Sequence, residues 1–488
     1  MYMKERKELM KKGIKRKNHF RPFRFETITN YLLFPTLMVL LMNLFYLDWP
    51  RNPFISFVGS IIFWYLFAET SFKRSDYFKL HRTYRYVVFT VITLGILLNA
   101  AFSYFISPNY SVSLSPIFLC VTILTILIGY EEGLASGLYL AFMTTTVNSF
   151  SIEDFVVLSV VALFSALLTR RILRRIHIAR AGFEVGAIFL SLRVVYYIFN
   201  MKFNMMDLTF SFLNPVISSI IAVGIIPYIE YVSRIYSDVG LLELGNLSHP
   251  LLKELSMNAP GTYYHSVAIA NLAEAAAEMI GVNAVLARVA SYFHDIGKTR
   301  RPQYFTENQR DINPHDGLTP SMSSLVINEH VKLGVELARK YRLPLLVEDV
   351  IREHHGTRVK KYFYHKAKNF GEANIENFKY PGPKPQFKES GIIMLADSVE
   401  AAFKSLKDPS LGKIKELVED IVNGIYNERQ LDQSGLNLSD LEEIIDAFTR
   451  VLVNTSQSRI EYPREKVEKV VISDENRNRK PNSKDNQS

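Results

Sequence analysis

The sequence predicts an all-α protein, in which a polytopic bundle of transmembrane helices is followed by a helical soluble domain. Three observations predict this class. Apolar runs near the ~20 residues that a helix needs to cross a bilayer recur up to residue 229. After residue 230 the composition becomes that of an ordinary charged domain. In that second half, alanine-rich stretches such as 267–278 and 284–291 have the apolar spacing of packed helices.

The membrane region, residues 27–229, contains about eight candidate spans by length and composition. A basic stretch, residues 1–26, precedes the first run, and no small-residue cleavage site follows that run, so we interpret it as an uncleaved span. A large soluble helical core is the alternative interpretation of these runs. The runs lie at 27–47, 53–70, 84–106, 113–130, 133–149, 153–169, 183–199 and 208–229.

The loop charges predict the orientation of the bundle. The net charge of +9 is concentrated at the N-terminus and in the loops at 71–85 and 170–180, whereas the alternate loops are nearly neutral or acidic. Because cytoplasmic loops carry the excess of Lys and Arg, we expect a multi-pass plasma-membrane protein with both termini in the cytoplasm. The basic charge therefore indicates a lipid bilayer as the partner and not DNA. The single cysteine, Cys120, excludes an intramolecular disulfide.

The soluble half divides into three predicted parts. Residues 230–260 form a helical connector that ends in a turn, and residues 261–472 form the domain itself. Within that domain, residues 365–390 are rich in Lys, Asn and Pro, and this composition is incompatible with regular helix. Residues 473–488 are polar, so we expect a disordered tail.

An ordered series of histidines and aspartates runs through the soluble half. Imidazole and carboxylate are the ligands that suit Zn, Fe or Mn. A carboxylate can bridge two cations, so seven such side chains suffice for two metals and leave positions open for water and substrate. Satisfied core or surface histidines are the usual explanation for one such residue, but a poor one for the whole series. The series consists of His265, His294, Asp295, His330, His354, His355 and Asp397.

This series resembles the HD superfamily of metal-dependent phosphohydrolases, whose pattern is His…His-Asp…Asp, and the additional histidines resemble its two-metal branch. Residues 240–400 are similar to the cytoplasmic HD domain of the bacterial seven-transmembrane-HD family, the cyclic-di-AMP phosphodiesterases. The membrane half agrees, and the resemblance covers most of the chain. The supporting stretches are 260–266, 294–298, 301–302, 305–309, 313–316, 354–357 and 362–364.

The resemblance implies a membrane-bound phosphodiesterase that hydrolyses cyclic di-AMP to pApA with two divalent transition-metal ions, Fe or Mn. It implies that Asp295 bridges the two metals. Family members usually carry a large extracellular domain between the first two spans, but here that interval is only about residues 48–52. We therefore expect the bundle to act chiefly as an anchor. The implied ligand sets are His265, His294, Asp295 and Asp397 for one metal, and Asp295, His330, His354 and His355 for the other.

Several neighbouring residues are predicted to act on the substrate. Lys298 lies one helical turn from His294, so it can reach the same cleft and neutralise phosphate charge, and we assign it a catalytic role together with Asp295. Besides Lys298, the predicted substrate contacts are Arg301, His315 and Thr357, and Tyr362 and Tyr364, whose rings can stack on a base. Each of these residues also has a purely structural interpretation. Lys298 can be a surface lysine, Arg301 and His315 can be loop residues, Thr357 can belong to a helix-ending turn, and the two tyrosines can pack in the core.

Other functions stay open at this level. The first alternative is an HD phosphohydrolase that acts on another nucleotide. The residues after the His354-His355 pair, Gly356-Thr357-Arg358, argue against the cyclic-di-GMP enzymes, in which this pair extends into a motif that contains Glu and Gly-Tyr-Pro. A membrane sensor that only binds nucleotide is the second. A transporter is disfavoured because ionisable residues near the middle of the spans are few, Arg193 being the exception. A homodimer is left open, and His81 is interpreted as a residue at the cytoplasmic membrane edge.

Overall fold

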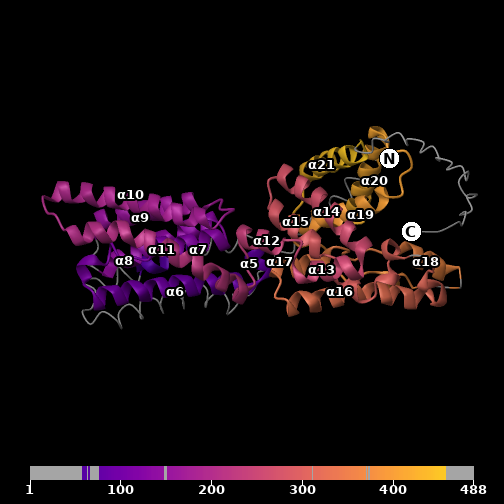
Figure 1. Cartoon of the computed structure of the whole chain (residues 1–488), viewed down its shortest axis with the longest axis horizontal. Coiled ribbons are helices and arrows are strands. Elements are labelled where there is room, and N and C mark those ends of the chain that lie inside the picture. The colour runs from indigo at the N-terminus through magenta and orange to yellow at the C-terminus, as the bar shows by residue number, and fades with distance from the viewer. Residues whose placement is uncertain are drawn as a thin grey trace, which may run out of the picture.

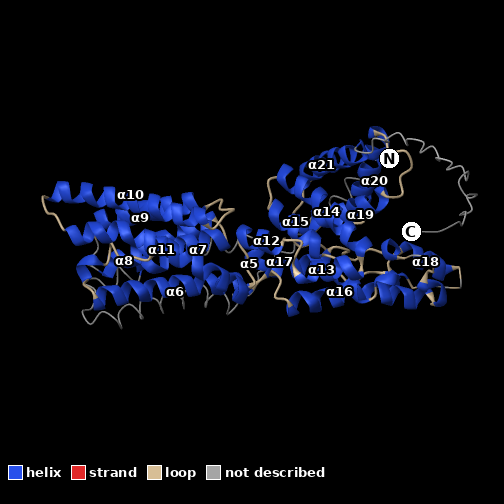
Figure 2. Ribbon diagram, in the orientation of Figure 1, coloured by secondary structure: helices blue, strands red, loops and turns tan. Residues whose placement is uncertain are grey.

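The computed structural model describes residues 58–62, 64–65, 76–147, 151–309, 312–369, 371 and 374–457. Within these ranges the secondary structure is helical, and the one β-type contact is an isolated bridge between Val359 and Lys379 (Figure 2). The helices form two lobes, a membrane lobe and a soluble lobe, which meet around α5, α12 and α17 (Figure 1). The all-α prediction is confirmed for the described part of the chain.

The membrane lobe contains the helices before residue 234. Four of them are long and apolar enough to cross a membrane: α6, α9, α10 and α11. The span expected at 27–47 lies outside the described residues, and the span expected at 53–70 is described only at residues 58–62 and 64–65, which are helical, so the count of eight stays a prediction. The helices are α5 (Asp76–Leu80), α6 (Arg82–Phe105), α7 (Ile117–Leu127), α8 (Tyr130–Val147), α9 (Ile152–Thr169), α10 (Ile176–Asn200) and α11 (Met205–Ser233).

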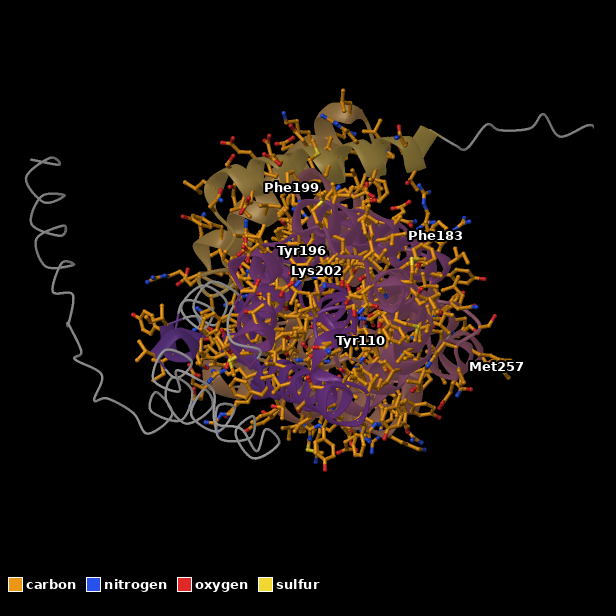
Figure 3. All side chains as sticks on the ribbon, turned by 90° about the vertical axis from the view of Figure 1, so that its left-hand side faces the viewer. Tyr110, Phe183, Tyr196, Phe199, Lys202 and Met257 are labelled. Atoms are coloured by element: carbon orange, nitrogen blue, oxygen red, sulfur yellow. The ribbon has the colours of Figure 1, made fainter. Side chains whose placement is uncertain are left out.

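The outer surface of this lobe is that of a protein in lipid. Large aromatic side chains stand exposed at both ends of the long helices, as in the aromatic belts of membrane proteins. Phe105 and Phe199 lie at the end far from the soluble lobe, and Tyr228 and Tyr231 lie at the near end. Figure 3 views the far end, where Tyr110, Tyr196 and Phe199 are labelled. Together with the four apolar helices, this surface identifies a membrane protein.

Arg193, the charge that stood out within the apolar runs, is paired inside the bundle. Its Nη1 donates to Asp154 Oδ1 at 2.7 Å and its Nε donates to Asp207 Oδ2 at 2.8 Å. Buried charges in membrane proteins normally pair in this way. The three residues lie on α10, α9 and α11, so this network links three of the long helices.

The soluble lobe is a second helical unit with its own core. Small side chains such as Ala273 and Ala290 let α14, α15 and α19 pack closely around Leu, Ile and Val residues. Asn283 caps α15 by accepting from the backbone N–H of Leu286. The helices are α12 (Asp238–Leu244), α13 (Pro250–Asn258), α14 (Pro260–Met279), α15 (Ala284–Phe293), α16 (Pro320–Lys340), α17 (Leu345–Glu353), α18 (Lys361–Lys368), α19 (Lys388–Phe403), α20 (Leu411–Asn427) and α21 (Leu438–Gln457), and the 3-10 turn η3 spans Ile296–Arg300.

Candidate metal centre

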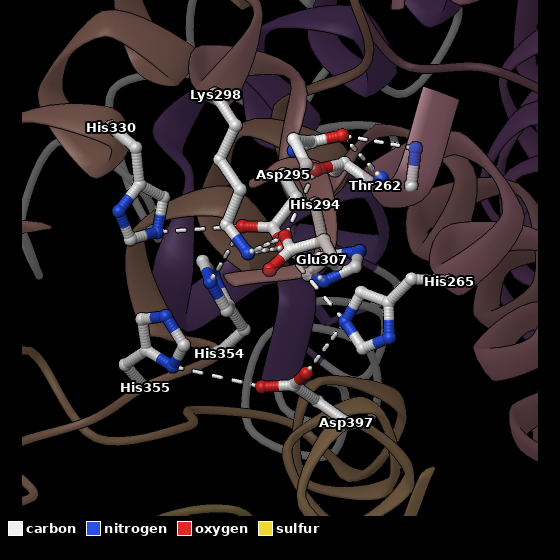
Figure 4. Close-up of polar contacts among 12 residues, drawn as sticks. Thr262, His265, His294, Asp295, Lys298, Glu307, His330, His354, His355 and Asp397 are labelled. Carbon is white, nitrogen blue, oxygen red and sulfur yellow. Dashed lines mark hydrogen bonds and ion pairs between the residues drawn. The ribbon is translucent and has the colours of Figure 1, made fainter. Parts of the chain in front are cut away.

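The predicted ligand residues come from five helices and meet at one place in the soluble lobe (Figure 4). α14, α16 and α19 each present one of them, the end of α15 presents a pair, and the end of α17 presents the His354-His355 pair. Their ligand atoms form two groups, within each of which every atom lies within 4.8 Å of the others. One group is Asp295, His330, His354 and His355, and the other is His265, His294 and Asp397.

The carboxylate of Asp295 lies between the two groups. Its Oδ1 is 3.4 Å from His330 Nε2 and 3.6 Å from His354 Nε2. Its Oδ2 is 3.1 Å from His294 Nε2 and 4.0 Å from His265 Nε2. Each oxygen therefore faces a different group, which is the geometry that a bridging carboxylate needs.

Hydrogen bonds on the outer side of the rings orient three of the histidines. In His294, His330 and His354 the Nδ1–H donates to the backbone carbonyl three residues earlier, at 2.8, 2.5 and 2.9 Å. This bond fixes the tautomer, so each Nε2 presents a lone pair to the centre. All three Nε2 atoms are buried and have no hydrogen-bond partner, and the same holds for Asp295 Oδ1.

Such unpartnered buried atoms are rare in folded proteins, and one cation in each of the two groups would satisfy them. Burial lowers the pKa of His330 to about 3, so this imidazole is neutral at pH 7, as a metal ligand must be. Burial would also lower the pKa of His265, but hydrogen bonds to Asp397 and Glu400 raise it to about 9. Metal binding at His265 would therefore release a proton. The donor set fits divalent metals, which HD domains bind.

Lys298 lies against the same carboxylate and is buried. Its Nζ is 2.7 Å from Asp295 Oδ2 and donates to Glu307 Oε1 at 2.8 Å. Burial opposes the charge of Lys298, but the two carboxylates outweigh it and raise its pKa. Glu307 also accepts a hydrogen bond from Thr262 Oγ1 at 2.9 Å. The ammonium group is thus held in place at the edge of the ligand groups.

Gly297 explains how η3 comes so close to α16. A Cβ added at this position would lie 1.9 Å from the backbone oxygen of His330 and 2.6 Å from the nitrogen of Gly334. Only glycine allows this approach of one backbone to another. The glycine that follows His294-Asp295-Ile296 therefore allows Asp295 to lie beside His330.

Three residues near the centre were missed by the sequence reasoning. Glu400 Oε2 accepts from His265 Nδ1 at 2.6 Å, and Glu307 holds Lys298. The ring of Tyr380 stacks on His355, with centroids 4.1 Å apart and planes 28° apart. Glu400 follows Asp397 by three residues on one helix, so helical spacing was a signal that it faces the same site. For Tyr380 the sequence contained no such signal.

The structure binds most of the other predicted substrate contacts to protein groups and leaves one of them exposed. Arg301 Nη1 is 3.0 Å from Glu329 Oε2. The ring of Tyr362 is exposed, and the ring of Tyr364 packs against Phe378 with centroids 5.9 Å apart.

Two others are buried or held near the ligands. His315 is buried and its Nε2 donates to the carbonyl oxygen of Tyr304 at 2.9 Å. Thr357, directly after the left-handed Gly356, donates its N–H and Oγ1–H to Gln430 Oε1 at 3.0 and 3.1 Å. Thr357 is thereby fixed two residues beyond His355, close in sequence to the ligands.

A helical domain with this histidine-aspartate constellation, placed after a bundle of apolar helices, identifies a membrane protein of the HD class. Residues 262–402 match the family model of the HD domain. Residues 52–237 match that of the "7TM receptor with intracellular HD hydrolase". The chain belongs to this membrane-bound HD family, which confirms the resemblance found in the sequence.

Two curated proteins and one solved structure are similar to this chain. The Cyclic-di-AMP phosphodiesterase PgpH of Bacillus subtilis (strain 168) is 46% identical over 248 residues, which cover 50% of this chain and 35% of that protein. PgpH of Listeria monocytogenes serotype 1/2a (strain 10403S) is 36% identical over 389 residues, or 78% of this chain and 50% of that protein. The crystal structure of the L. monocytogenes PgpH HD domain in complex with cyclic di-AMP is 44% identical, with a TM-score of 0.42, and covers 44% of this chain and 100% of that chain. The chain thus spans between about a third and a half of the length of these two curated relatives.

Proposed function

We propose that the protein is a membrane-bound phosphodiesterase that hydrolyses cyclic di-AMP to pApA and so controls the level of this second messenger. The observation that carries the proposal is the pair of buried ligand groups on either side of Asp295. The choice of substrate is supported by the two PgpH relatives, both of which are named cyclic-di-AMP phosphodiesterases.

The two groups would each hold one divalent transition-metal ion, Fe or Mn, with Asp295 shared between them. A pair of such ions makes water nucleophilic at neutral pH and stabilises the attacking and leaving oxygens of a phosphodiester. The histidines supply neutral donors in fixed orientations, because their outer nitrogens are already hydrogen-bonded.

The chain's own residues would bind and orient the substrate around that pair. Lys298 presents a buried positive charge at the same carboxylate, where it offsets charge on the scissile phosphate. Thr357 lies next to the His354-His355 pair, and its hydroxyl could donate to a phosphate oxygen once it releases Gln430 Oε1. The exposed ring of Tyr362 is free to stack on a base. Arg301 and His315 would have to release their present partners before they contact the substrate.

We place the domain in the cytoplasm and assign residues 1–26 to a basic arm, 27–229 to the membrane region, 230–260 to the connector, 261–472 to the HD domain and 473–488 to a tail. Support comes from the Arg-rich loop at 170–175, which lies at the end of the bundle near the soluble lobe, where Arg175 bonds Glu243 at 2.7 Å. Lys202 lies at the opposite end (Figure 3).

The orientation is tested by thiol labelling, because the one native cysteine, Cys120, is buried. Arg171→Cys and Lys202→Cys would be treated in intact cells with a membrane-impermeant maleimide. We expect labelling of the second variant and not of the first until the cells are opened. The reverse pattern would place the HD domain outside the cell.

The activity is tested with the full chain in lipid nanodiscs, loaded with Mn²⁺ or Fe²⁺ and offered cyclic di-AMP, cyclic di-GMP and nucleoside triphosphates. We expect cyclic di-AMP to be converted to pApA, with Asp295→Asn, prepared in the same way, as the inactive control. Turnover of another nucleotide alone would show a different hydrolase. Tight binding of cyclic di-AMP without turnover by metal-loaded protein would favour the nucleotide sensor.

A further inference from the structure

Helix α17 (Leu345–Glu353) connects the membrane lobe to the metal centre. Its last residue is followed directly by His354 and His355, two ligands of the group that contains His330. Its first two turns contact residues of the membrane lobe. In Figure 1 the helix lies where the two lobes meet.

The first turn of α17 is bound to the residue that ends α11. Arg234 adopts a left-handed conformation, with φ of 59°, which is unfavourable for a residue other than glycine. Its carbonyl oxygen accepts from the N–H of Leu345 at 3.0 Å, and its Nε donates to Leu343 O at 2.7 Å. Its Nη2 donates to Glu348 Oε2 at 2.8 Å. Three hydrogen bonds from one residue thus fix the start of α17 to the end of a membrane helix.

Arg342, on the other side of this junction, makes the reciprocal contact. It too is left-handed, with φ of 52°. Its Nε donates to Tyr231 O at 3.2 Å and its Nη2 donates to Val232 O at 3.3 Å. These are carbonyls of the last turn of α11, which lack partners within the helix and carry the negative end of its dipole. The two arginines therefore interlock α11 with the segment that leads into α17.

The second turn of α17 is held from the start of α6. His81, the residue before α6, has its Nε2 2.5 Å from Oδ2 of Asp349, and this carboxylate is buried. Nearby, Tyr77 of α5 donates at 3.3 Å to Oε1 of Glu389, which lies in the first turn of α19. α19 carries Asp397, a ligand of the other group. The segment before α6 thus contacts both of these ligand-bearing helices.

We infer that α17 couples the membrane lobe to the metal centre, and that Arg234 and His81 are positioning residues for His354 and His355. A nine-residue helix is a stiff rod of about 14 Å, so a displacement at its start moves its end. Metal–ligand distances tolerate only about 0.2 Å. Small movements of α6 or α11 would therefore change how well the histidine pair binds metal. On this inference the bundle does more than anchor the domain, and it needs no extracellular domain to do so.

The experiment measures Mn²⁺ affinity of the full chain in nanodiscs, by the electron paramagnetic resonance signal of free Mn²⁺. His81→Ala and Arg234→Gln are compared with His177→Ala and Arg171→Gln, which change exposed residues whose side chains contact no ion-pair or hydrogen-bond partner in the described chain. We expect the dissociation constant of one of the two Mn²⁺ sites, the one that contains His354 and His355, to rise about tenfold in the first two variants, the size of effect seen when ligand-orienting contacts are lost. The control variants should leave it unchanged.

Conservative variants separate positioning from general damage. Arg234→Lys keeps the charge but cannot make both side-chain bonds, so its affinity should lie between those of the unaltered chain and Arg234→Gln. Asp349→Asn keeps the shape of the side chain. If His81→Ala does not fold, the Mn²⁺ affinity of Asp349→Asn tests the same contact. The double variant His81→Ala/Asp349→Asn should bind Mn²⁺ no more weakly than the worse single variant, because His81 acts through Asp349, which also accepts from Arg352 Nη1 at 3.1 Å.

Activity gives a second readout, which rests on the proposed function. The kcat for cyclic di-AMP should fall with the loss of metal while KM stays unchanged. If folded His81→Ala and Arg234→Gln bind Mn²⁺ as tightly as the unaltered chain, the coupling role is overturned. If the unaltered chain binds two Mn²⁺ but hydrolyses no cyclic di-AMP, the proposed function fails, and the affinity measurement still decides the role of α17.

Discussion

Glu400→Gln is the most informative single substitution at the ligands. Glu400 Oε2 accepts from His265 Nδ1 at 2.6 Å, and both side chains are less than a tenth exposed. The corresponding acceptors for His294, His330 and His354 are backbone carbonyls, which no side-chain substitution removes. The change keeps the shape of the side chain but replaces a carboxylate with an uncharged amide. It therefore tests how far the outer hydrogen bond supports the ligand.

The expected magnitude follows from this geometry. Loss of an outer partner of a metal-bound histidine typically costs 10–100-fold in metal affinity, about 1.4–2.8 kcal/mol. A hydrogen bond to a charged group contributes about 1.5–3 kcal/mol, and water cannot replace it at a buried position. We therefore expect Glu400→Gln to weaken Mn²⁺ binding by about 10–100-fold.

Calorimetric titration of the full chain with Mn²⁺ is the assay for Glu400→Gln. Glu416→Gln, on the exposed face of α20, is the matched control and should bind as the unaltered chain does. If folded Glu400→Gln binds both metals with unchanged affinity, then the charge of Glu400 does not support His265 as a ligand, and this reasoning is refuted.

Four further predictions follow from the same contacts. Asp295→Asn removes the carboxylate that both groups share, so turnover should fall at least about 100-fold and bound metal, counted by mass spectrometry, should fall below two ions. Unchanged stoichiometry would exclude bridging. Gly297→Ala places a Cβ 1.9 Å from His330 O, so thermal denaturation should show a loss of about 1–3 kcal/mol; an unchanged midpoint would contradict the close approach. With Mn²⁺ at 100 times its dissociation constant, binding contributes about 2.7 kcal/mol, so a chelator should lower the melting temperature of the HD domain by about 5–10 °C, and no shift would argue against metal in the folded state. Burial opposes ionisation of Glu348, but hydrogen bonds from Arg234 and Arg339 outweigh it and lower its pKa. This stabilisation is therefore complete above the usual carboxylate pKa of about 4.3 and is lost as pH falls through the lower folded value, so Glu348→Gln should show a shallower acid loss of stability than the unaltered chain.

Much of the architecture was open to prediction because its signals are local. Apolar run length and helical spacing depend on neighbouring residues, and they predicted the all-α class and the membrane helices that the structure describes. The ligand set could also be predicted, because a series of His and Asp residues in this order is typical of HD metal sites. His294, Asp295 and Gly297 stand close together in sequence, and the structure brings them beside His330. The metals themselves stay a prediction.

What the sequence could not predict depends on contacts between distant segments. His81 and Asp349 are 268 residues apart, and only the docking of the two lobes brings them together. From the sequence we interpreted His81 as a membrane-edge residue, and no sequence pattern indicated Asp349 as its partner. Tyr380 lies within the insertion at 365–390, directly before its prolines, and the composition of this segment says nothing of where the chain goes. The expectation that the whole insertion lacks regular helix was wrong at its two ends, where α18 extends to Lys368 and α19 begins at Lys388. Periodicity shows which face of a helix is polar, not which group that face will meet.

The two-metal centre is tested most directly by anomalous scattering from crystals of the Mn²⁺-loaded protein. We predict two anomalous peaks about 3.5–4 Å apart, one on each side of the Asp295 carboxylate. One peak would lie within coordination distance of His265, His294 and Asp397, and the other within that distance of His330, His354 and His355. A single peak, or peaks away from Asp295, would contradict a centre in which both metals share this residue.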